Sequence, residues 1–293
     1  MGKSIASQKN IIFAIFLTIL GGSSLAIMDA ISKELTSYFE VIQVLWSRYF
    51  FHAFIVIMYL LFSQPIAVFK TNRPKIQILR SFSLFGATLA MYTSLKYLPL
   101  ADAAAVQFSA PVLVTIFSAL FLGEKIGTRR YLAVITAFLG VLIIVQPGGS
   151  FRWVMILPMI TALLVAIFLI QTRQLNNVDS PYTTLFYSTL VGMIILIFVT
   201  PFFWRQPNHN QFLMMCLQGG LGAVGHLAII RGLQYATASF LSPFLYSQLI
   251  VASVVSVSYL GDPLTYEIIL GSGLIVLSGI YIWYREVYLI NHR

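Results

Sequence analysis

Residues 11–32 read IIFAIFLTILGGSSLAIMDAIS, a run with a single charged side chain, Asp29. A helix needs about twenty apolar residues to cross the hydrocarbon core of a bilayer, so the run predicts a transmembrane helix. Lys3 and Lys9 precede it as in a secretory signal peptide, but many similar runs follow, and we interpret it as an uncleaved first span. The fold class predicted from this run is an all-α integral membrane protein.

The composition of the whole chain agrees with this interpretation. Of the 293 residues 59% are hydrophobic and 9% are charged, whereas a soluble domain carries roughly a quarter charged residues. The net charge of +9 comes from residues in the gaps between apolar runs and not from a basic stripe, so we predict no nucleic-acid partner. The single cysteine, Cys216, offers neither a disulfide framework nor metal-ligand spacing. No metal or other cofactor is predicted.

Cutting the chain at its polar and Pro/Gly-rich gaps predicts ten transmembrane helices. The gaps around Pro99 and around Asp262-Pro263 leave room for only a tight turn, so consecutive helices should be antiparallel neighbours in one bundle. The predicted spans are residues 11–32, 41–62, 76–96, 101–121, 130–146, 152–172, 181–203, 211–233, 238–260 and 266–284.

The distribution of Lys and Arg predicts the orientation, because cytoplasmic loops retain an excess of positive side chains. With the N-terminus inside, thirteen of these residues lie on the inner side, with the strongest cluster running from Lys70 to Arg80. Four fall outside, namely Lys33, Lys96, Arg152 and Arg205. The even number of spans then makes both the N-terminus and the C-terminus cytoplasmic.

A repeat with an offset of 138 residues divides the chain. Leu95 and Tyr97 correspond to Leu233 and Tyr235, and Leu122-Gly123-Glu124 corresponds to Leu260-Gly261-Asp262. Because five spans separate the copies, the second copy should be inverted in the membrane, as in many transporters. We therefore expect two similar halves, residues 1–146 (spans one to five) and 147–293 (spans six to ten).

These paired turns, with Arg48-Tyr49-Phe50, Leu95-Lys96-Tyr97 and Phe108-Ser109-Ala110-Pro111, resemble the drug/metabolite transporter superfamily, whose repeat units are EamA domains. Asp29-Ala30-Ile31-Ser32-Lys33 and the stretch around Arg73-Pro74 also look like the branch of bacterial S-adenosylmethionine uptake carriers. The resemblance implies a multi-pass carrier of the bacterial inner membrane with a central cavity between the halves. Family members differ widely in substrate, so the resemblance does not name the solute.

Two charged residues within the spans are the first candidates for substrate binding, because an ionisable group at membrane depth is costly unless it is paired, hydrated or functional. Asp29 lies late in the first span and Arg48 about a third of the way into the second, so the two could face each other. The alternative is that Asp29 ends its helix near the headgroups and that Arg48 snorkels to the same interface.

Six uncharged side chains complete the predicted substrate site. The amides need partners away from lipid, the aromatic rings could attract a cationic or planar solute, and an imidazole can relay protons. Each has a structural alternative, namely hydrogen bonding or packing between helices. The candidates are Tyr92, Gln107, Phe108, His226, Tyr246 and Gln248. No second ligating residue accompanies His226 at metal-ligand spacing, so we expect no metal site there.

Two further features concern the helices themselves. Gly220-Leu221-Gly222-Ala223-Val224-Gly225 matches the dinucleotide-binding fingerprint, but no strand precedes it, and we interpret it as a helix-packing face. Pro111 and Pro243 lie inside the fourth and ninth spans, where they should bend the helices beside a cavity.

The function predicted from these features is secondary transport, by alternating access, of a small polar organic metabolite. An amino-acid-like zwitterion or cation fits the candidate side chains, and S-adenosylmethionine is one such solute. An enzyme is disfavoured, since no nucleophile with a base and no metal cluster occurs at helical spacing. The alternative is an exporter of drugs or toxic amphiphiles, which would need an apolar aromatic cavity. The sequence predicts neither the coupling ion, the direction nor the oligomeric state.

Overall fold

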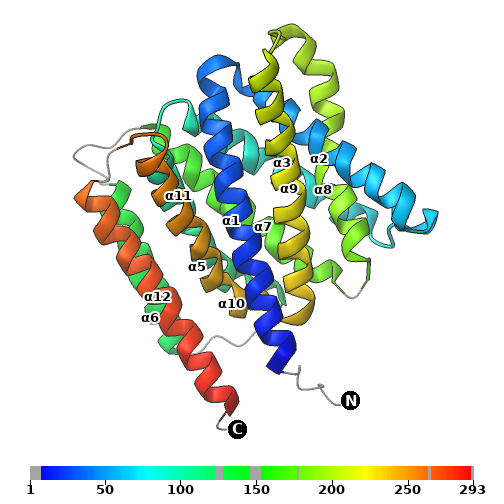
Figure 1. The fold of residues 1–293 in the computed structure, drawn as a ribbon. Coiled ribbons are helices and arrows are strands. Elements are labelled where there is room, and N and C mark those ends of the chain that lie inside the picture. Colours follow the sequence, from blue (N-terminus) through cyan, green and yellow to red (C-terminus); the bar gives the residue numbers. More distant parts are fainter. Residues whose placement is uncertain (1–7, 123–127, 146–152, 177, 263–264, 292–293) are drawn as a thin grey trace.

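The protein is a bundle of helices, and no strand occurs in the part of the chain that the structure describes (Figure 1). This computed structural model describes residues 8–122, 128–145, 153–176, 178–262 and 265–291. The α-helices are α1 (Gln8–Tyr38), α2 (Val41–Ser63), α3 (Pro74–Leu95), α4 (Leu100–Gln107), α5 (Ala110–Leu122), α6 (Thr128–Val145), α7 (Ile156–Leu175), α8 (Pro181–Val199), α9 (His209–Tyr235), α10 (Ala238–Leu241), α11 (Tyr246–Ser258) and α12 (Tyr266–Asn291). Four 3₁₀ helices are η1 (Ile66–Phe69), η2 (Trp153–Met155), η3 (Thr200–Phe203) and η4 (Ser242–Leu245).

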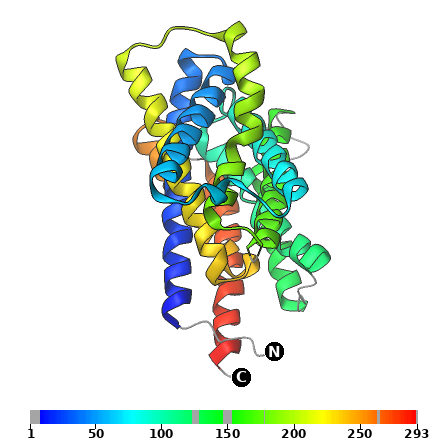
Figure 2. The same cartoon turned by 90° about the vertical axis from the view of Figure 1, so that its right-hand side faces the viewer.

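Helical structure occupies every one of the predicted spans. Five segments are long and apolar enough to cross a membrane, and three shorter apolar helices accompany them, so the chain is a multi-pass membrane protein. The five segments are Asn10–Tyr38, Val41–Ser63, Trp153–Leu175, Pro181–Phe203 and His209–Tyr235. That all ten segments cross the bilayer remains a prediction, as does the cytoplasmic location of the two chain ends. The start of α1 and the end of α12 lie at the same end of the bundle (Figures 1 and 2).

The bends expected from the prolines occur. The fourth predicted span is broken into α4 and α5 directly before Pro111, and the ninth is broken into α10, η4 and α11 around Pro243. Backbone groups released by such breaks must be satisfied by protein or by water in a cavity. Both breaks are therefore expected to lie beside protein or a cavity inside the bundle.

Helix contacts are reciprocal between the two halves. The contact of α1 with α9 has a counterpart in α3 with α7, that of α2 with α9 in α8 with α3, and that of α1 with α11 in α7 with α5. The remaining large contacts join equivalent helices, α2 with α8 and α6 with α12 (Figure 1). This is the pattern expected for two similar halves related by a pseudo-two-fold axis, the arrangement that the sequence predicts.

The glycine-rich run of the second half lies inside α9 and packs helices together, as predicted. A Cβ on Gly225 would lie 3.1 Å from the carbonyl oxygen of Gly21 in α1. In the same way, a Cβ on Gly271 of α12 would lie 2.5 Å from the carbonyl oxygen of Gly140 in α6. Only glycine allows the backbones to approach so closely, and no dinucleotide-binding turn is formed.

The turn at Gly261-Asp262 caps a helix of the other half. Gly261 has a φ of 72°, in the left-handed region that favours glycine. The Asp262 carboxylate accepts hydrogen bonds from the backbone N–H of Leu100 at 3.3 Å and from the Ser256 hydroxyl at 2.8 Å. The first of these satisfies a donor at the start of α4. The equivalent turn at Glu124 lies outside the described residues.

Inverted halves predict that these two turns lie on opposite faces of the membrane. Single cysteines placed at position 124 or 262, in a background in which Cys216 is serine, should react with a membrane-impermeant thiol reagent from opposite sides of oriented vesicles. Labelling of both positions from the same side would refute the inverted repeat.

The loop before α3 is held to the loop after α7 through Asp179. Its carboxylate accepts from the Thr71 hydroxyl, from the Asn72 backbone N–H at 3.0 Å and from Gln77 Nε2 at 2.9 Å. Burial alone would raise the pKa of Asp179, but these hydrogen bonds outweigh it and lower the pKa from its ordinary value of 3.8. The ionised carboxylate therefore stabilises the contact between the halves.

We expect Asp179→Asn to destabilise the protein by about 1–2 kcal/mol at pH 7, since an amide replaces one charged acceptor oxygen with a donor. A depressed pKa gives stability that is complete above the unfolded value, 3.8, and lost as the pH falls through the folded value. The difference in melting temperature between the two proteins in detergent should therefore shrink below about pH 4. A difference that is the same at pH 7 and pH 3.5 would contradict this role.

Candidate functional site

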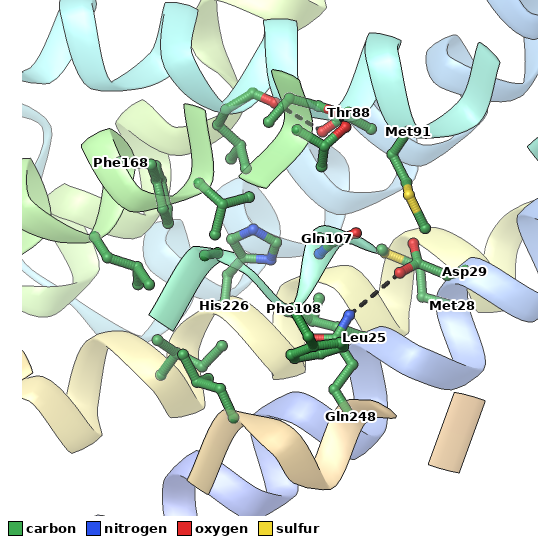
Figure 3. Close-up of a pocket in the computed structure, with 18 of the residues that line it drawn as sticks. Leu25, Met28, Asp29, Thr88, Met91, Gln107, Phe108, Phe168, His226 and Gln248 are labelled. Atoms are coloured by element: carbon green, nitrogen blue, oxygen red, sulfur yellow. Dashed lines mark hydrogen bonds between the residues drawn. The ribbon is translucent and has the colours of Figure 1, made fainter. Parts of the chain in front are cut away.

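A cavity of about 90 Å³ lies in the centre of the bundle. Its wall is built by α1, α2, α3, α4, α7, α9 and α11 together with the ends of α5 and η4, so both halves contribute (Figure 3). Seven of the eight predicted site residues line it: Asp29, Arg48, Tyr92, Gln107, Phe108, His226 and Gln248. The eighth, Tyr246, lies behind the wall, where its ring packs on Phe108 with centroids 5.8 Å apart.

The two charged candidates share this cavity without pairing directly. Asp29 and Arg48 are 7% and 4% exposed, and in the described part of the chain neither has an ion-pair partner within 4.0 Å. The Asp29 carboxylate accepts from Gln248 Nε2 at 3.3 Å, and Arg48 donates to the Thr88 hydroxyl. Each charge is thus held by a neutral group and remains able to meet an opposite charge on a solute.

Helix α1 positions Asp29 away from any helix end. The helix continues to Tyr38, nine residues beyond Asp29. One turn after Asp29, Lys33 donates to the Leu95 and Leu98 carbonyl oxygens, both at 2.8 Å. Asp29 therefore does not end its helix, as the alternative assumed. The Arg48 guanidinium does not reach the surface of the protein but lies over the rings of Tyr49 and Tyr92, 5.3 and 5.7 Å from their centroids.

The two amides differ in their partners. Gln248 bonds to Asp29, whereas the buried Oε1 of Gln107 has no hydrogen-bond partner among the described residues. Gln107 is the last residue of α4, and the break before α5 directs it at the cavity (Figure 3). A buried acceptor without a partner costs free energy that a donor on a solute, or a water molecule, would recover.

His226 has a defined tautomer when neutral. Its Nδ1 lies 2.9 Å from the Gly222 carbonyl oxygen, which can only accept, so Nδ1 carries the proton and Nε2 is left as an acceptor. The sequence spacing suggested that His226 stands alone. In the structure the His52 ring of α2 lies beside it, with ring centroids 5.6 Å apart. Neither ring has a carboxylate partner within 4.0 Å in the described chain.

Sequence reasoning missed several residues on the cavity wall. Leu84 and Thr88 stand eight and four positions before the predicted Tyr92 on the same face of α3, and Thr161, Val165 and Phe168 follow one face of α7. The interval of four marks one face of a helix but not which face is turned inward, since these spans are apolar on all sides. Thr88 could have been found only by knowing that it faces Arg48.

Arg80 lies inside α3, within the predicted third span, but it was counted among the charges of the inner side and its complete burial was not predicted. Its exposed fraction is 0%. Four polar groups on α3, α7 and α8 accept from it, and the following helical turns carry the cavity wall. Arg80 is therefore a buried charge within the bundle, and the remaining inner charges still favour the same orientation.

Comparison with known proteins identifies relatives over most of the chain. The chain is 23% identical over 259 residues to an S-adenosylmethionine uptake transporter of Rickettsia bellii, covering 88% of this chain and 89% of the relative. It is 29% identical to a riboflavin transporter of Vibrio cholerae, covering 70% of each, and 24% identical to a pseudopaline exporter of Pseudomonas aeruginosa, covering 78% and 81%.

The fold has a counterpart among solved structures. A crystal structure of a protein with 17% identity superposes with a TM-score of 0.71, covering 93% of this chain and 96% of the other. The EamA-like transporter family matches twice, at residues 12–146 and 152–284. The two matches together span nearly the whole sequence, and the chain belongs to the EamA-like transporter family, within the drug/metabolite transporter superfamily.

Proposed function

We propose that this protein is a secondary carrier that moves an amino-acid-like zwitterion or cation across the bacterial inner membrane by alternating access. The observation that carries the proposal is the pair of separated charges in one cavity, Asp29 on α1 and Arg48 on α2. An ammonium or sulfonium group would meet the carboxylate, and the carboxylate of an amino acid would meet the guanidinium. The uncharged candidates Gln107, Phe108, His226 and Gln248 then contact the rest of the solute.

The size of the cavity supports a cycle of conformations. Binding sites for organic ligands usually have volumes of about 300–1,000 Å³. The cavity here, at about 90 Å³, is several times smaller. A solute therefore enters only when the wall separates, and the wall is shared by the two halves. Residues 1–146 and 147–293 are the bodies that we propose rock against each other around the site.

The relatives support a metabolite but leave the direction of transport open. One relative is named as an S-adenosylmethionine uptake transporter, one as a riboflavin transporter and one as a pseudopaline exporter. S-adenosylmethionine carries a cationic sulfonium, an amino-acid end and a ring that could stack on Phe108, which matches the proposed site best. The competing function, export of an amphiphile, is favoured by the apolar part of the wall, which includes Leu25, Met91 and Leu169.

The test is transport by purified protein in proteoliposomes. We expect uptake of a zwitterion or cation from a labelled panel that includes S-adenosylmethionine, amino acids, riboflavin and dicarboxylates, and faster uptake when the same solute is present on the other side. Excess S-adenosylmethionine should compete. Preference for dicarboxylates or sugar phosphates would show that Arg48 dominates recognition, and the proposal of a zwitterion or cation would be abandoned.

A further inference from the structure

Arg80 is a fully buried cation whose partners are all neutral. Nε donates to the Thr172 hydroxyl at 2.7 Å, and the two terminal nitrogens donate to Gln77 Oε1, to the Thr184 carbonyl oxygen and to the Ser188 hydroxyl at 3.3, 2.9 and 2.8 Å. In the residues that the structure describes, no carboxylate lies within 4.0 Å. A buried charge usually carries a counterion, so this arrangement calls for an explanation.

Asp179, the nearest acidic group in this network, does not fill that role. It bonds to Gln77 Nε2 at 2.9 Å, while Gln77 Oε1 accepts from Arg80 at 3.3 Å. The amide therefore stands between the two charges, and the carboxylate is engaged by the loop at Thr71 and Asn72. The positive charge of Arg80 is solvated by hydroxyl and carbonyl dipoles without being neutralised.

Arg80 continues the inner face of the cavity wall by one helical turn. On α3 the wall residues Leu84 and Thr88 stand four and eight positions after Arg80. On α7 the wall residue Phe168 stands four positions before Thr172, the partner of Arg80. Residues four apart lie above one another on a helix, so Arg80 and Thr172 lie directly beneath this edge of the cavity.

The Phe168 ring separates Arg80 from the cavity. The guanidinium carbon lies 4.5 Å from the ring centroid, and the ring packs edge-to-face with the His226 ring, which lines the cavity, with centroids 5.9 Å apart. Phe168 thus contacts the guanidinium on one side and the cavity lining on the other. Beyond Arg80 toward the start of α3 lies the loop of Thr71 and Asn72.

We propose that Arg80 is a second anion-binding group on the path between the cavity and the end of the bundle that carries both chain ends, the cytoplasmic end in the predicted orientation. It receives the carboxylate of the solute after Arg48 releases it, once Phe168 has moved. Neutral hydroxyl partners are easily exchanged for a carboxylate, which the planar guanidinium binds through two parallel hydrogen bonds. This inference rests on the proposed carrier function.

The test measures the local potential without needing the natural solute. In a Cys216→Ser background, Ala87→Cys places a thiol on the cavity wall. Its rate of modification is measured in vesicles of both orientations with two membrane-impermeant methanethiosulfonates, one carrying a sulfonate and one a trimethylammonium group. The comparison is made with Arg80 intact, with Arg80→Gln and Arg80→Lys, and with Lys75→Gln, which removes the same charge from an exposed position in the first turn of α3.

Each rate is first divided by the rate of the same reagent with a small free thiol in solution, because a thiolate reacts intrinsically faster with a cationic reagent. With Arg80 intact, the normalised rate of the sulfonate should exceed that of the trimethylammonium reagent from the face where α1 begins and α12 ends. The ratio of the sulfonate rate to the trimethylammonium rate should fall about tenfold in Arg80→Gln. It should be unchanged in Arg80→Lys and change little in Lys75→Gln, because only a charge on the path distinguishes the reagents strongly. A structural role alone would alter both rates together.

The outcomes separate the two proposals. Equal normalised rates for the two reagents with Arg80 intact would overturn the anion site, even if Arg80→Gln proved unable to fold. An unchanged ratio in a folded Arg80→Gln protein would do the same. Modification of position 87 from neither face, or from one face only under all conditions, would instead contradict alternating access itself.

Discussion

Gly219→Ala should destabilise the folded protein by about 1–3 kcal/mol, whereas Gly220→Ala, one position later in the same helix, should be neutral or stabilising. A Cβ on Gly219 would lie 2.4 Å from Cβ of Phe51 and 2.8 Å from the backbone N of His52 in α2. Neither atom can move without shifting the helix. A Cβ on Gly220 would meet only the Ile55 Cδ1 methyl, at 3.6 Å.

The two variants are matched controls, since they have identical composition and both replace glycine by a better helix former. The difference in stability is measured by heating each variant in detergent and determining the folded fraction that remains by size-exclusion chromatography. Because α2 carries Arg48 and α9 carries His226, any Gly219→Ala protein that folds should also lose transport. Equal melting temperatures for the two variants would mean that α2 and α9 are not packed as closely as the structure shows.

The helices could be predicted from the sequence because their signals are local. Each apolar run predicts a helix by its length, and the breaks at the fourth and ninth spans follow from the rings of Pro111 and Pro243, which cannot donate a backbone hydrogen bond. The first span was predicted six residues too short at its end, at Ser32. Lys33, which suggested an end, is satisfied by distant partners, the carbonyl oxygens of Leu95 at the end of α3 and of Leu98 after it.

The site could be predicted only in part. Asp29 and Arg48 stand out because charges are rare in apolar spans, and both line the cavity. Arg80 carries the same signal, but it lies near the start of its predicted span and close to Lys75 and Arg73, so the sequence groups it with the charges of the inner side. Its burial depends on the packing of α3 against α7 and α8, which no local pattern encodes. The role of Asp29, Arg48 and Arg80 in binding solute remains a proposal.

Arg48→Gln and Asp29→Asn should each raise the half-saturation concentration of a zwitterionic solute by about 30- to 1,000-fold, with far smaller effects on stability. Truncating one partner of a buried charge pair costs ~2–4 kcal/mol, and each 1.4 kcal/mol is tenfold in affinity. In the absence of solute Asp29 is held by Gln248 and Arg48 by Thr88, and both partners are neutral. Neither variant therefore leaves an opposite charge unpaired within ion-pair distance.

The two variants also distinguish the kinds of solute. A cation without a carboxylate should lose affinity in Asp29→Asn and be nearly unaffected by Arg48→Gln, whereas a zwitterion should respond to both and a dicarboxylate to Arg48→Gln alone. The control is Glu40→Gln, which breaks the exposed ion pair with Lys96 at 2.9 Å and should leave transport unchanged. Initial rates of uptake in proteoliposomes, over a range of solute concentrations and at equal amounts of folded protein, provide the measurement. Wild-type half-saturation in both charge variants would remove Asp29 and Arg48 from the substrate site, because a charge that binds the solute cannot be lost without a change in affinity.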